Sequence, residues 1–424
     1  MEVSLSVSNL LPTHIYSYLA DIAFPPVRGI CPSLTLKATV LHAGANKDGT
    51  HIDSTLNCKI ARNTDVGHAQ LAKYVTRKSV YHLNDAVKHF QLVLNQCPVG
   101  HPDQAAALTN LAWARLKGYI QNDFRDIDAI ISLFREALTL RPQGHSDYPL
   151  SIYHLTETLT WCYHKERTAV FIHESAQLFC QLLPLCPEGT YLRSIAAGDG
   201  QGTSLRNIAA GAHGVDYVIR ECNKLPIDAS NEVIRLQRIV LELCPLGNKH
   251  RPKALDKLAR ALITHFQQRG SIDDLDECIQ RHREAVFLCP EGHSERDTYL
   301  NNLALSLKFR FDHHSNPNDL NEAISLYEEA LRLRPVGHKS RASSLDNLGI
   351  ILHIRFSQRG DVNDIMRAIS LHREALILRP PGNPYRDSTL NNLTLALKTR
   401  HVKLAASEDL NEAIDLYRDS LRLR

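Results

Sequence analysis

The sequence predicts an all-α fold, an α-solenoid of antiparallel helix pairs, and two observations lead to this prediction. The first is the tripeptide Pro-x-Gly, which recurs at Pro98, Pro142, Pro187, Pro245, Pro290, Pro335 and Pro380. Five of the six steps are 44 or 45 residues long, and the step from Pro187 to Pro245 is 58. The second is the helical spacing of apolar residues inside each step. A fixed period of this length is typical of repeat proteins.

Each unit contains two helical patterns, and residues 293–335 show them most clearly. The apolar positions of the first pattern lie at i, i+3, i+4 and i+7: Leu300, Leu303, Ala304 and Leu307. The second pattern places Ala323, Tyr327 and Ala330 on one stripe and ends at Pro335. Such stripes predict two amphipathic helices that pack through their apolar faces. The polar stretch "DHHSNPND" at 312–319 is interpreted as the linker between them.

Acidic residues are expected to begin the second helices. Asp319 is predicted to be an N-cap, and Glu322 three residues later completes a capping-box arrangement. The same arrangement recurs at Asp274 with Glu277 and at Asp409 with Glu412, and Asp126 and Asp364 supply the cap without the Glu. The following proline and glycine are expected to end each second helix and to turn the chain.

The periodicity sets the expected boundaries of the array. The solenoid is predicted over 51–424, with clear repeats at 101–189 and 248–424. Degenerate repeats are predicted at 51–98 and 190–245, and residues 1–50 show no repeat and are expected to be irregular.

The long step contains a tandem copy. "LRSIAAG" begins at Leu192 and "LRNIAAG" at Leu205, an offset of 13 residues that equals the excess length of this step. The intervening "GDGQGTS" lacks the lysine of a phosphate-binding P-loop and the G-x-G-x-x-G spacing of a dinucleotide site. The glycine-rich stretch is therefore interpreted as an internal duplication, and one copy is expected to be dispensable.

The apolar positions of the unit at 293–335 resemble the signature positions of the tetratricopeptide repeat (TPR). The unit here is about 45 residues, similar to the enlarged repeats of kinesin light chains and to arrays attached to fungal NLR-type and CHAT-type proteins. The resemblance implies a superhelix in which the first helix of each pair lines a concave groove. It also implies a non-catalytic scaffold that binds a peptide or protein segment there. The alternative is the regulatory or sensor array of a larger NLR- or CHAT-type signalling protein.

The composition of the chain limits the classes of partner that we expect. Lys plus Arg total 49 against 46 Asp plus Glu, a net charge of +3, which is not the basic footprint of a nucleic-acid binder. No apolar run has the length of a membrane helix, and the N-terminus lacks the pattern of a secretion signal. We expect a cytoplasmic protein with neither nucleic-acid nor membrane partners.

The ten cysteines do not indicate a disulfide framework or a zinc site. Cysteine and arginine share one repeat position before the Pro-x-Gly turn: Cys97, Arg141, Cys186, Cys244, Cys289, Arg334 and Arg379. A position shared in this way is not a set of metal ligands, so reduced thiols are expected. No cofactor and no metal are predicted.

Asparagine recurs at one position of the first helices and is the leading candidate for binding: Asn110, Asn302, Asn347 and Asn392. Its amide has two donors and an acceptor, which suits the backbone of a bound peptide. The resemblance to kinesin-light-chain-like arrays implies that asparagines in this "LNNL" context line the groove, as they do in those arrays. The alternative is that these amides tie adjacent repeats together or are solvated.

Basic residues on the same helices could give the groove a preference for anions: Lys257, Arg260, Lys308 and Lys398. The favoured alternative is that they lie on an ordinary solvated helix face. His282 and His372 begin H-x-E sequences, but the P-C-x-x-C element of a zinc deaminase is absent. No other catalytic motif is present, so the sequence predicts no enzyme.

The last helical pattern, "DLNEAIDLYRDSLRLR", is expected to leave an apolar stripe partly uncovered at Ile414, Tyr417 and Leu421. Terminal repeats of solenoids normally have a polar outer face. The uncovered stripe favours self-association or continuation of the array.

Overall fold

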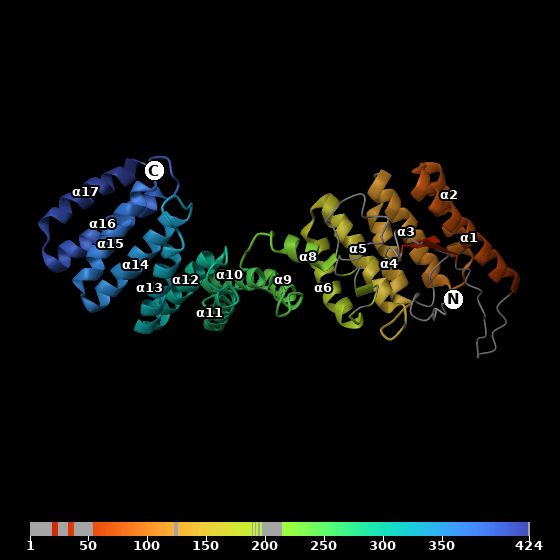
Figure 1. Ribbon diagram of the computed structural model, residues 1–424, viewed down its shortest axis with the longest axis horizontal. Helices are drawn as coiled ribbons and strands as arrows, with labels where there is room; N and C mark the ends of the chain where they lie inside the picture. The colour runs from red at the N-terminus through yellow and green to blue at the C-terminus, as the bar shows by residue number, and fades with distance from the viewer. Residues whose placement is uncertain are drawn as a thin grey trace, which may run out of the picture. The chain divides into compact units, whose positions relative to one another are not determined.

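The computed structural model describes residues 19–23, 33–37, 54–122, 126–188, 190, 192–193, 196 and 214–422. Within these ranges the chain is almost entirely helical, which confirms the predicted all-α class (Figure 1). The duplicated stretch around "GDGQGTS" lies outside the described residues. The chain divides into two compact units, Met1–Cys222 (unit 1) and Asn223–Arg424 (unit 2), and each is described by itself.

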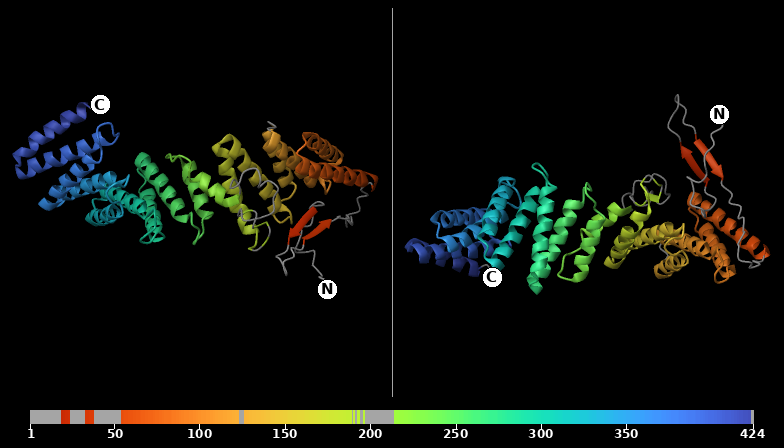
Figure 2. Two further views of the ribbon diagram at one scale, coloured as in Figure 1. Left: turned by 45° about the horizontal axis from the view of Figure 1, so that its top comes forward. Right: turned by 90° about the horizontal axis from the view of Figure 1, so that it is seen from below.

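Unit 1 begins with two short strands and continues with helices. The strands β1 (Leu19–Ala23) and β2 (Ser33–Lys37) pair antiparallel, with Leu19 opposite Lys37, in the segment that was expected to be irregular (Figure 2). The helices are α1 (Ser54–Arg77), α2 (Val80–Gln96), α3 (Gln104–Asn122), α4 (Ile127–Thr139), α5 (Tyr148–Glu166), α6 (Ala169–Leu185) and α8 (Gly214–Cys222).

Unit 2 is the regular part of the array. Its helices are α9 (Asn231–Glu242), α10 (Arg251–Arg269), α11 (Ile272–Phe287), α12 (Arg296–His314), α13 (Pro317–Arg332), α14 (Arg341–Arg359), α15 (Val362–Ile377), α16 (Arg386–Leu404) and α17 (Ser407–Arg422). The first helices α10, α12, α14 and α16 begin 45 residues apart, and each is followed by its second helix.

The apolar stripes form the core as predicted. Leu300, Leu303, Ala304 and Leu307 of α12 and Ala323, Tyr327 and Ala330 of α13 are all buried. Most of them belong to one cluster that also contains residues of α11, α14 and α15, so the core continues from one pair to the next. This continuity is what a solenoid requires, because a single pair cannot cover its own apolar face.

The prediction that residues 312–319 form a linker between the two helices is wrong. Helix α12 continues to His314, Ser315 adopts the left-handed conformation with φ 53°, and α13 begins at Pro317. The extra residues of the 45-residue unit therefore lengthen the helices to 19 and 16 residues. A left-handed residue can end a helix and satisfy its last carbonyls without a long connection, and the Ser315 N–H bonds the Phe311 carbonyl.

The expected caps at Asp274, Asp319, Asp364 and Asp409 are also wrong, whereas Asp126 does hold the N-cap position of α4. Asp319 lies in the first turn of α13, after the N-cap Asn316. Its carboxylate accepts two hydrogen bonds from the Arg310 guanidinium, at 2.7 and 3.0 Å. Arg355 with Asp364 and Arg400 with Asp409 repeat this pair. These aspartates therefore join the two helices of a pair.

The glutamates of the expected capping boxes pair with the preceding second helix instead. Glu322 of α13 accepts from Arg283 of α11 at 2.8 Å. One repeat later the two charges are exchanged between the helices. Glu328 of α13 takes the position of Arg283 and pairs with Arg367 of α15, which takes the position of Glu322, at 2.5 Å. The following pair, Arg373 with Glu412, returns to the first arrangement.

In unit 2, an arginine that starts each first helix connects consecutive pairs. Arg296 donates to the Cys289 carbonyl at the end of α11 at 2.5 Å and to Glu329 of α13 at 2.8 Å. Arg251 and Arg341 make the same two contacts in their own repeats. No helix among the described residues combines the length and apolar character of a membrane span.

Candidate peptide-binding face on the first helices

The first helices of unit 2 present one row of accessible side chains, which we call the first-helix face. It consists of Lys257, Arg260, Asn302, Leu305, Asn347, Ile350, Asn392 and Leu395. On α12, Leu303, Ala304 and Ser306 are buried between and beside the residues of this row, so helical geometry places the row away from the core. Leu305 and Leu395 are 36% and 52% exposed, which is unusual beside so many buried leucines.

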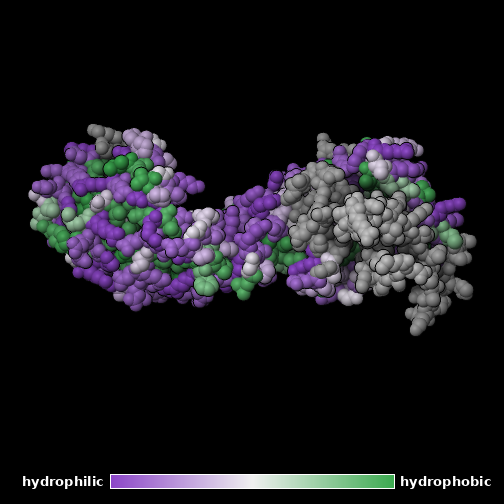
Figure 3. Space-filling view, viewed as in Figure 1, coloured by the Kyte–Doolittle hydropathy of each residue, from purple (hydrophilic) through white to green (hydrophobic). Residues whose placement is uncertain are grey.

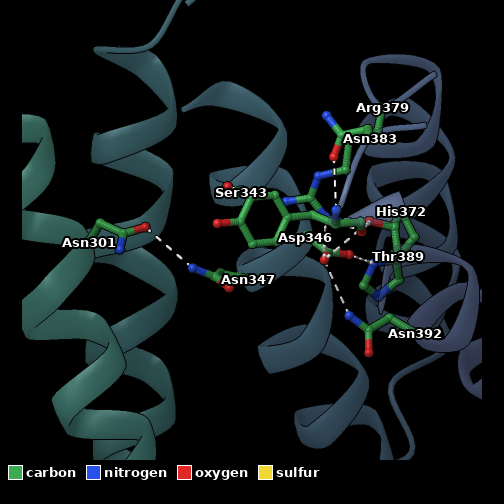
Figure 4. Close-up of polar contacts among 10 residues, drawn as sticks. Asn301, Ser343, Asp346, Asn347, His372, Arg379, Asn383, Thr389 and Asn392 are labelled. Atoms are coloured by element: carbon green, nitrogen blue, oxygen red, sulfur yellow. Dashed lines mark hydrogen bonds and ion pairs between the residues drawn. The ribbon is translucent and has the colours of Figure 1, made fainter. Parts of the chain in front are cut away.

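The asparagines of this face connect consecutive first helices. The Asn302 amide donates to Asp256 Oδ1 at 2.7 Å, across a separation of 46 residues. Asn347 donates to Asn301 Oδ1 at 3.4 Å, and Asn392 donates to Asp346 Oδ2 at 3.3 Å (Figure 4). One N–H of each amide therefore ties its helix to the helix before it, which is the structural role that the sequence left open.

Asp346 is the centre of the most extensive of these contacts (Figure 4). Its carboxylate accepts from His372 Nδ1 at 2.7 Å and from Arg379 Nη1 at 3.0 Å, and Arg379 also contacts Thr389. Burial opposes ionisation, but the hydrogen bonds and positive charges of His372 and Arg379 hold the pKa of this carboxyl below its usual value. Asp346 therefore remains charged inside unit 2.

The arginines that share a repeat position with cysteine before the Pro-x-Gly turn are buried. Arg379 contacts Asp346, and Arg334 bonds Asp297 at 2.6 Å and the Ser344 hydroxyl at 2.6 Å. Cys289 occupies the same position one repeat earlier and lies in an apolar cluster. No disulfide joins two cysteines of the described residues, and these residues form no group of metal ligands.

One cluster has the residue types of a nucleophilic site. His282 Nδ1 lies 2.9 Å from the Ser306 hydroxyl and 3.7 Å from Cys278 Sγ, and its Nε2 lies 3.5 Å from Asp256. All four side chains are buried. Burial raises the pKa of the Cys278 thiol to about 12, which is the opposite of what an activated nucleophile needs. These four side chains therefore serve to pack α10, α11 and α12 against one another.

The four predicted basic residues differ in their surroundings. Lys257 donates to the Leu225 carbonyl at 3.3 Å, and burial together with the Arg260 charge lowers its pKa. Lys308 forms an ion pair with Asp312 at 2.5 Å. Arg260 and Lys398 are exposed and face solvent. Two of the four cations are thus already engaged by the protein itself.

Asn110, the asparagine of unit 1 at this repeat position, is buried. Asn110 of α3 is 6% exposed, and Lys117 and Glu157, on α3 and α5, are buried as well. Burial lowers the pKa of Lys117 to about 8 and raises that of Glu157 to about 7. Asn110 therefore differs from the accessible asparagines of unit 2.

The sequence interpretation missed two kinds of residue on these helices. Asp256, Asn301 and Asp346 accept the asparagine hydrogen bonds, and they could have been found as a polar residue recurring one position before the asparagine. Leu305, Ile350 and Leu395 form an apolar column three residues after it. Their exposure depends on where the neighbouring helices lie, which a single amphipathic pattern does not specify.

No family model and no curated protein matches the chain. Among solved structures, a putative kinesin light chain from Podospora anserina with nearly identical TPR-like repeats is 14% identical, with 59% of this chain and 95% of that chain covered and a TM-score of 0.32. The human IFIT1 dimer with PPP-AAAA is 14% identical, with coverages of 89% and 96% and a TM-score of 0.33. The nuclear import adaptor Nro1 of S. pombe is 12% identical, with coverages of 80% and 98% and a TM-score of 0.25. Similarities at this level carry no argument about function.

The class of the protein follows from its own repeat. Helices of 19 and 16 residues alternate at a 45-residue period, and their buried positions are those of the TPR signature. The chain is a TPR-like α-solenoid with an enlarged unit.

Proposed function

We propose that this chain is a non-catalytic scaffold, acting in the cytoplasm, that binds a peptide or protein segment along the first-helix face of unit 2. The observation that supports this most directly is the apolar column beside the asparagines, in which Leu305 and Leu395 are exposed and Ile350 is half-buried. The face would form the concave wall of the superhelix, where an extended segment can contact several repeats at once.

The asparagines can serve this function while they tie the repeats together. An amide offers two N–H donors and a carbonyl acceptor, and the contact with the preceding helix uses one donor. A donor and an acceptor of Asn347 and Asn392 then match the backbone N–H and C=O of a bound segment. Because the tie also fixes the orientation of the amide, the site would be preorganised.

The basic residues refine the proposed partner only slightly. Arg260 and Lys398 are exposed and can approach an acidic side chain, whereas Lys257 and Lys308 already have protein partners. With a net charge of +3, a protein segment is favoured over a nucleic acid, whose binding requires a denser positive surface.

The test is selection of a displayed peptide library on the full chain, followed by titration of the enriched peptides. Leu305→Asp and Leu395→Asp should each weaken binding by about tenfold or more, as expected for central apolar contacts. Ile377→Asp is the matched control, because Ile377 is an exposed apolar residue of α15 outside the first-helix face. A homopolymeric RNA serves as a competitor.

The asparagines are tested by replacing Asn302, Asn347 and Asn392 with alanine. If they bind a peptide backbone, affinity should fall by about 1 kcal/mol per lost bond while the helical circular dichroism signal remains. Unfolding of the triple variant would show that the amides are structural alone. Enrichment of no peptide, equal losses in the Ile377 control, or preferential binding of RNA would each refute the proposed function.

A further inference from the structure

Unit 2 carries a row of exposed residues at its Pro-x-Gly turns, which we call the edge row. It consists of the middle residues of three successive turns, Leu246, Glu291 and Val336, and the last residues of α11, α13 and α15, Phe287, Arg332 and Ile377. Arg332 forms an ion pair with Glu291 of the preceding turn at 3.1 Å. By the 45-residue repeat, Phe287 holds the same position relative to Leu246, and Ile377 relative to Val336. The edge row is therefore an apolar pair, an ion pair and a second apolar pair.

The apolar residues of the edge row protrude further than any others in unit 2. Leu246, Phe287, Val336 and Ile377 are 78%, 84%, 81% and 80% exposed, the highest values of any large hydrophobic residue among the described residues of this unit. Figure 3 shows hydrophobic residues lying among hydrophilic ones on one face of unit 2. Side chains that protrude so far add little to the stability of the chain itself, so their gathering in one row marks an interaction surface.

The order of the two charges indicates the occupant of this surface. Glu291 precedes Arg332 along the row, and their side chains are 72% and 64% exposed, so both still present accessible polar atoms. A two-fold axis between them, perpendicular to the row, reverses the row in a second copy and sets Glu291 opposite Arg332 of that copy. The same axis sets Leu246 opposite Ile377 and Phe287 opposite Val336, so apolar side chains meet apolar ones. The four central charges alternate in sign, and each keeps its own partner while it gains a second.

Two other arrangements fit less well. A parallel order of the two rows sets Glu291 opposite Glu291 and Arg332 opposite Arg332, which brings like charges together. On α17, Ile414 and Tyr417 are exposed, as expected, and the side chain of Leu421 lies outside the described residues. The described residues around that stripe do not indicate an occupant. We propose that the edge row is an interface with a second copy of this chain, packed antiparallel about a two-fold axis between Glu291 and Arg332.

The oligomeric state of the full chain tests this interface. Four apolar residues per copy make a small interface, so we expect a weak dimer that forms at micromolar concentrations. Sedimentation equilibrium should show a monomer–dimer equilibrium in the wild type, and Phe287→Glu with Ile377→Glu should raise the dissociation constant by about tenfold or more. Val402→Glu is the matched control, because Val402 is 71% exposed and lies near the end of α16, whereas the turns of the edge row precede the first helices. The control should dimerise as the wild type does, and circular dichroism reports whether each variant is folded.

Cross-linking tests the antiparallel order. A chain with Leu246→Cys and a chain with Ile377→Cys should form a disulfide when they are mixed and oxidised, because these positions face each other across the axis. Mass spectrometry identifies the linked peptides, which separates this disulfide from any that involves a native cysteine. Leu246→Cys by itself should not link to a second copy of the same variant.

Each outcome decides one part of the proposal. A wild type that remains monomeric at millimolar concentration refutes the interface, as does a dimer insensitive to Phe287 and Ile377. A dimer in which Leu246→Cys does not link to Ile377→Cys refutes the antiparallel order. Because neither readout involves a peptide, the result is independent of the first-helix face.

Discussion

Replacing Asp346 with asparagine should uncouple the last two helix pairs. The change keeps the size of the side chain and removes its negative charge. Arg379 would then be a buried cation without its carboxylate, since the two side chains are only 6% and 8% exposed in the wild type. His372 would lose its acceptor at 2.7 Å, or Asn392 its acceptor at 3.3 Å, because an amide has one carbonyl oxygen.

The magnitude follows from these contacts. Removing one partner of a buried ion pair costs about 3–5 kcal/mol, and the remaining amide oxygen favours the lower end of this range. A loss of about 3 kcal/mol corresponds to roughly a hundredfold faster hydrogen exchange in α14, α15 and α16, at tenfold for each ~1.4 kcal/mol. Hydrogen exchange with mass spectrometry suits this test, because a long array need not unfold in a single step.

The pH dependence gives a second readout. The folded-state pKa of Asp346 lies below its ordinary value of 3.8, so its stabilisation is fully present above that pH. It is lost as the pH falls through the lower folded-state pKa. The asparagine variant does not titrate there, so the difference in melting temperature between wild type and variant should shrink in acid.

The control is Asp312→Asn, the same chemical change at an exposed carboxylate that pairs with Lys308. An exposed pair contributes about 0–1 kcal/mol, so its exchange rates should change little. If Asp346→Asn has no larger effect than Asp312→Asn, or if its effect persists unchanged in acid, Asp346 does not hold these repeats together.

Three further predictions concern single side chains. Gly349→Ala should destabilise unit 2 by about 1–3 kcal/mol in thermal unfolding despite the better helix propensity of alanine, because the new Cβ would lie 2.7 Å from the His372 ring; an unchanged melting temperature would refute this close packing. Ser315→Gly should stabilise the chain by about 1 kcal/mol, because Ser315 has φ 53° where the equivalent residues Gly270 and Gly360 adopt the same conformation without strain; a lower melting temperature would contradict this. Iodoacetamide should label the exposed Cys58 and leave the buried Cys278 unmodified in the native protein, as mass spectrometry can show; rapid labelling of Cys278 would show that its cluster opens to solvent.

The sequence was sufficient for features that depend on local periodicity. The stripe from Leu300 to Leu307 follows from helical geometry alone, and the turn at Gly292 follows from a glycine that adopts φ 93°. The ends of the helices were less predictable. His313 and His314 are polar and lie at the solvent-facing end of α12, where no apolar spacing distinguishes a helix from a linker.

The side-chain partners depend on how the helices pack. Aspartate is a residue type that commonly caps helices. The Arg310 guanidinium on the neighbouring helix is nevertheless a stronger hydrogen-bond partner for the Asp319 carboxylate than a backbone N–H is. The constant offset of nine residues between Arg310 and Asp319, repeated at Arg355 and Asp364, was the available signal. The asparagine contacts likewise join residues 46 apart, one more than the period, and only the stacking of helices brings them together.

The exchange of charge between neighbouring second helices bears on how such similar repeats assemble in the right order during folding. If α15 docked on α11 with the intervening pair left out, Arg283 would face Arg367. Docking of α17 on α13 would set Glu328 against Glu412. Both of these misassembled states bring like charges together, whereas an array in which every pair had the same orientation would bring opposite charges together when one helix pair was omitted. The single exchanged pair, Glu328 with Arg367, thus distinguishes the repeats around it, which their apolar stripes do not, and disfavours two of the kinetic traps to which repetitive chains are prone.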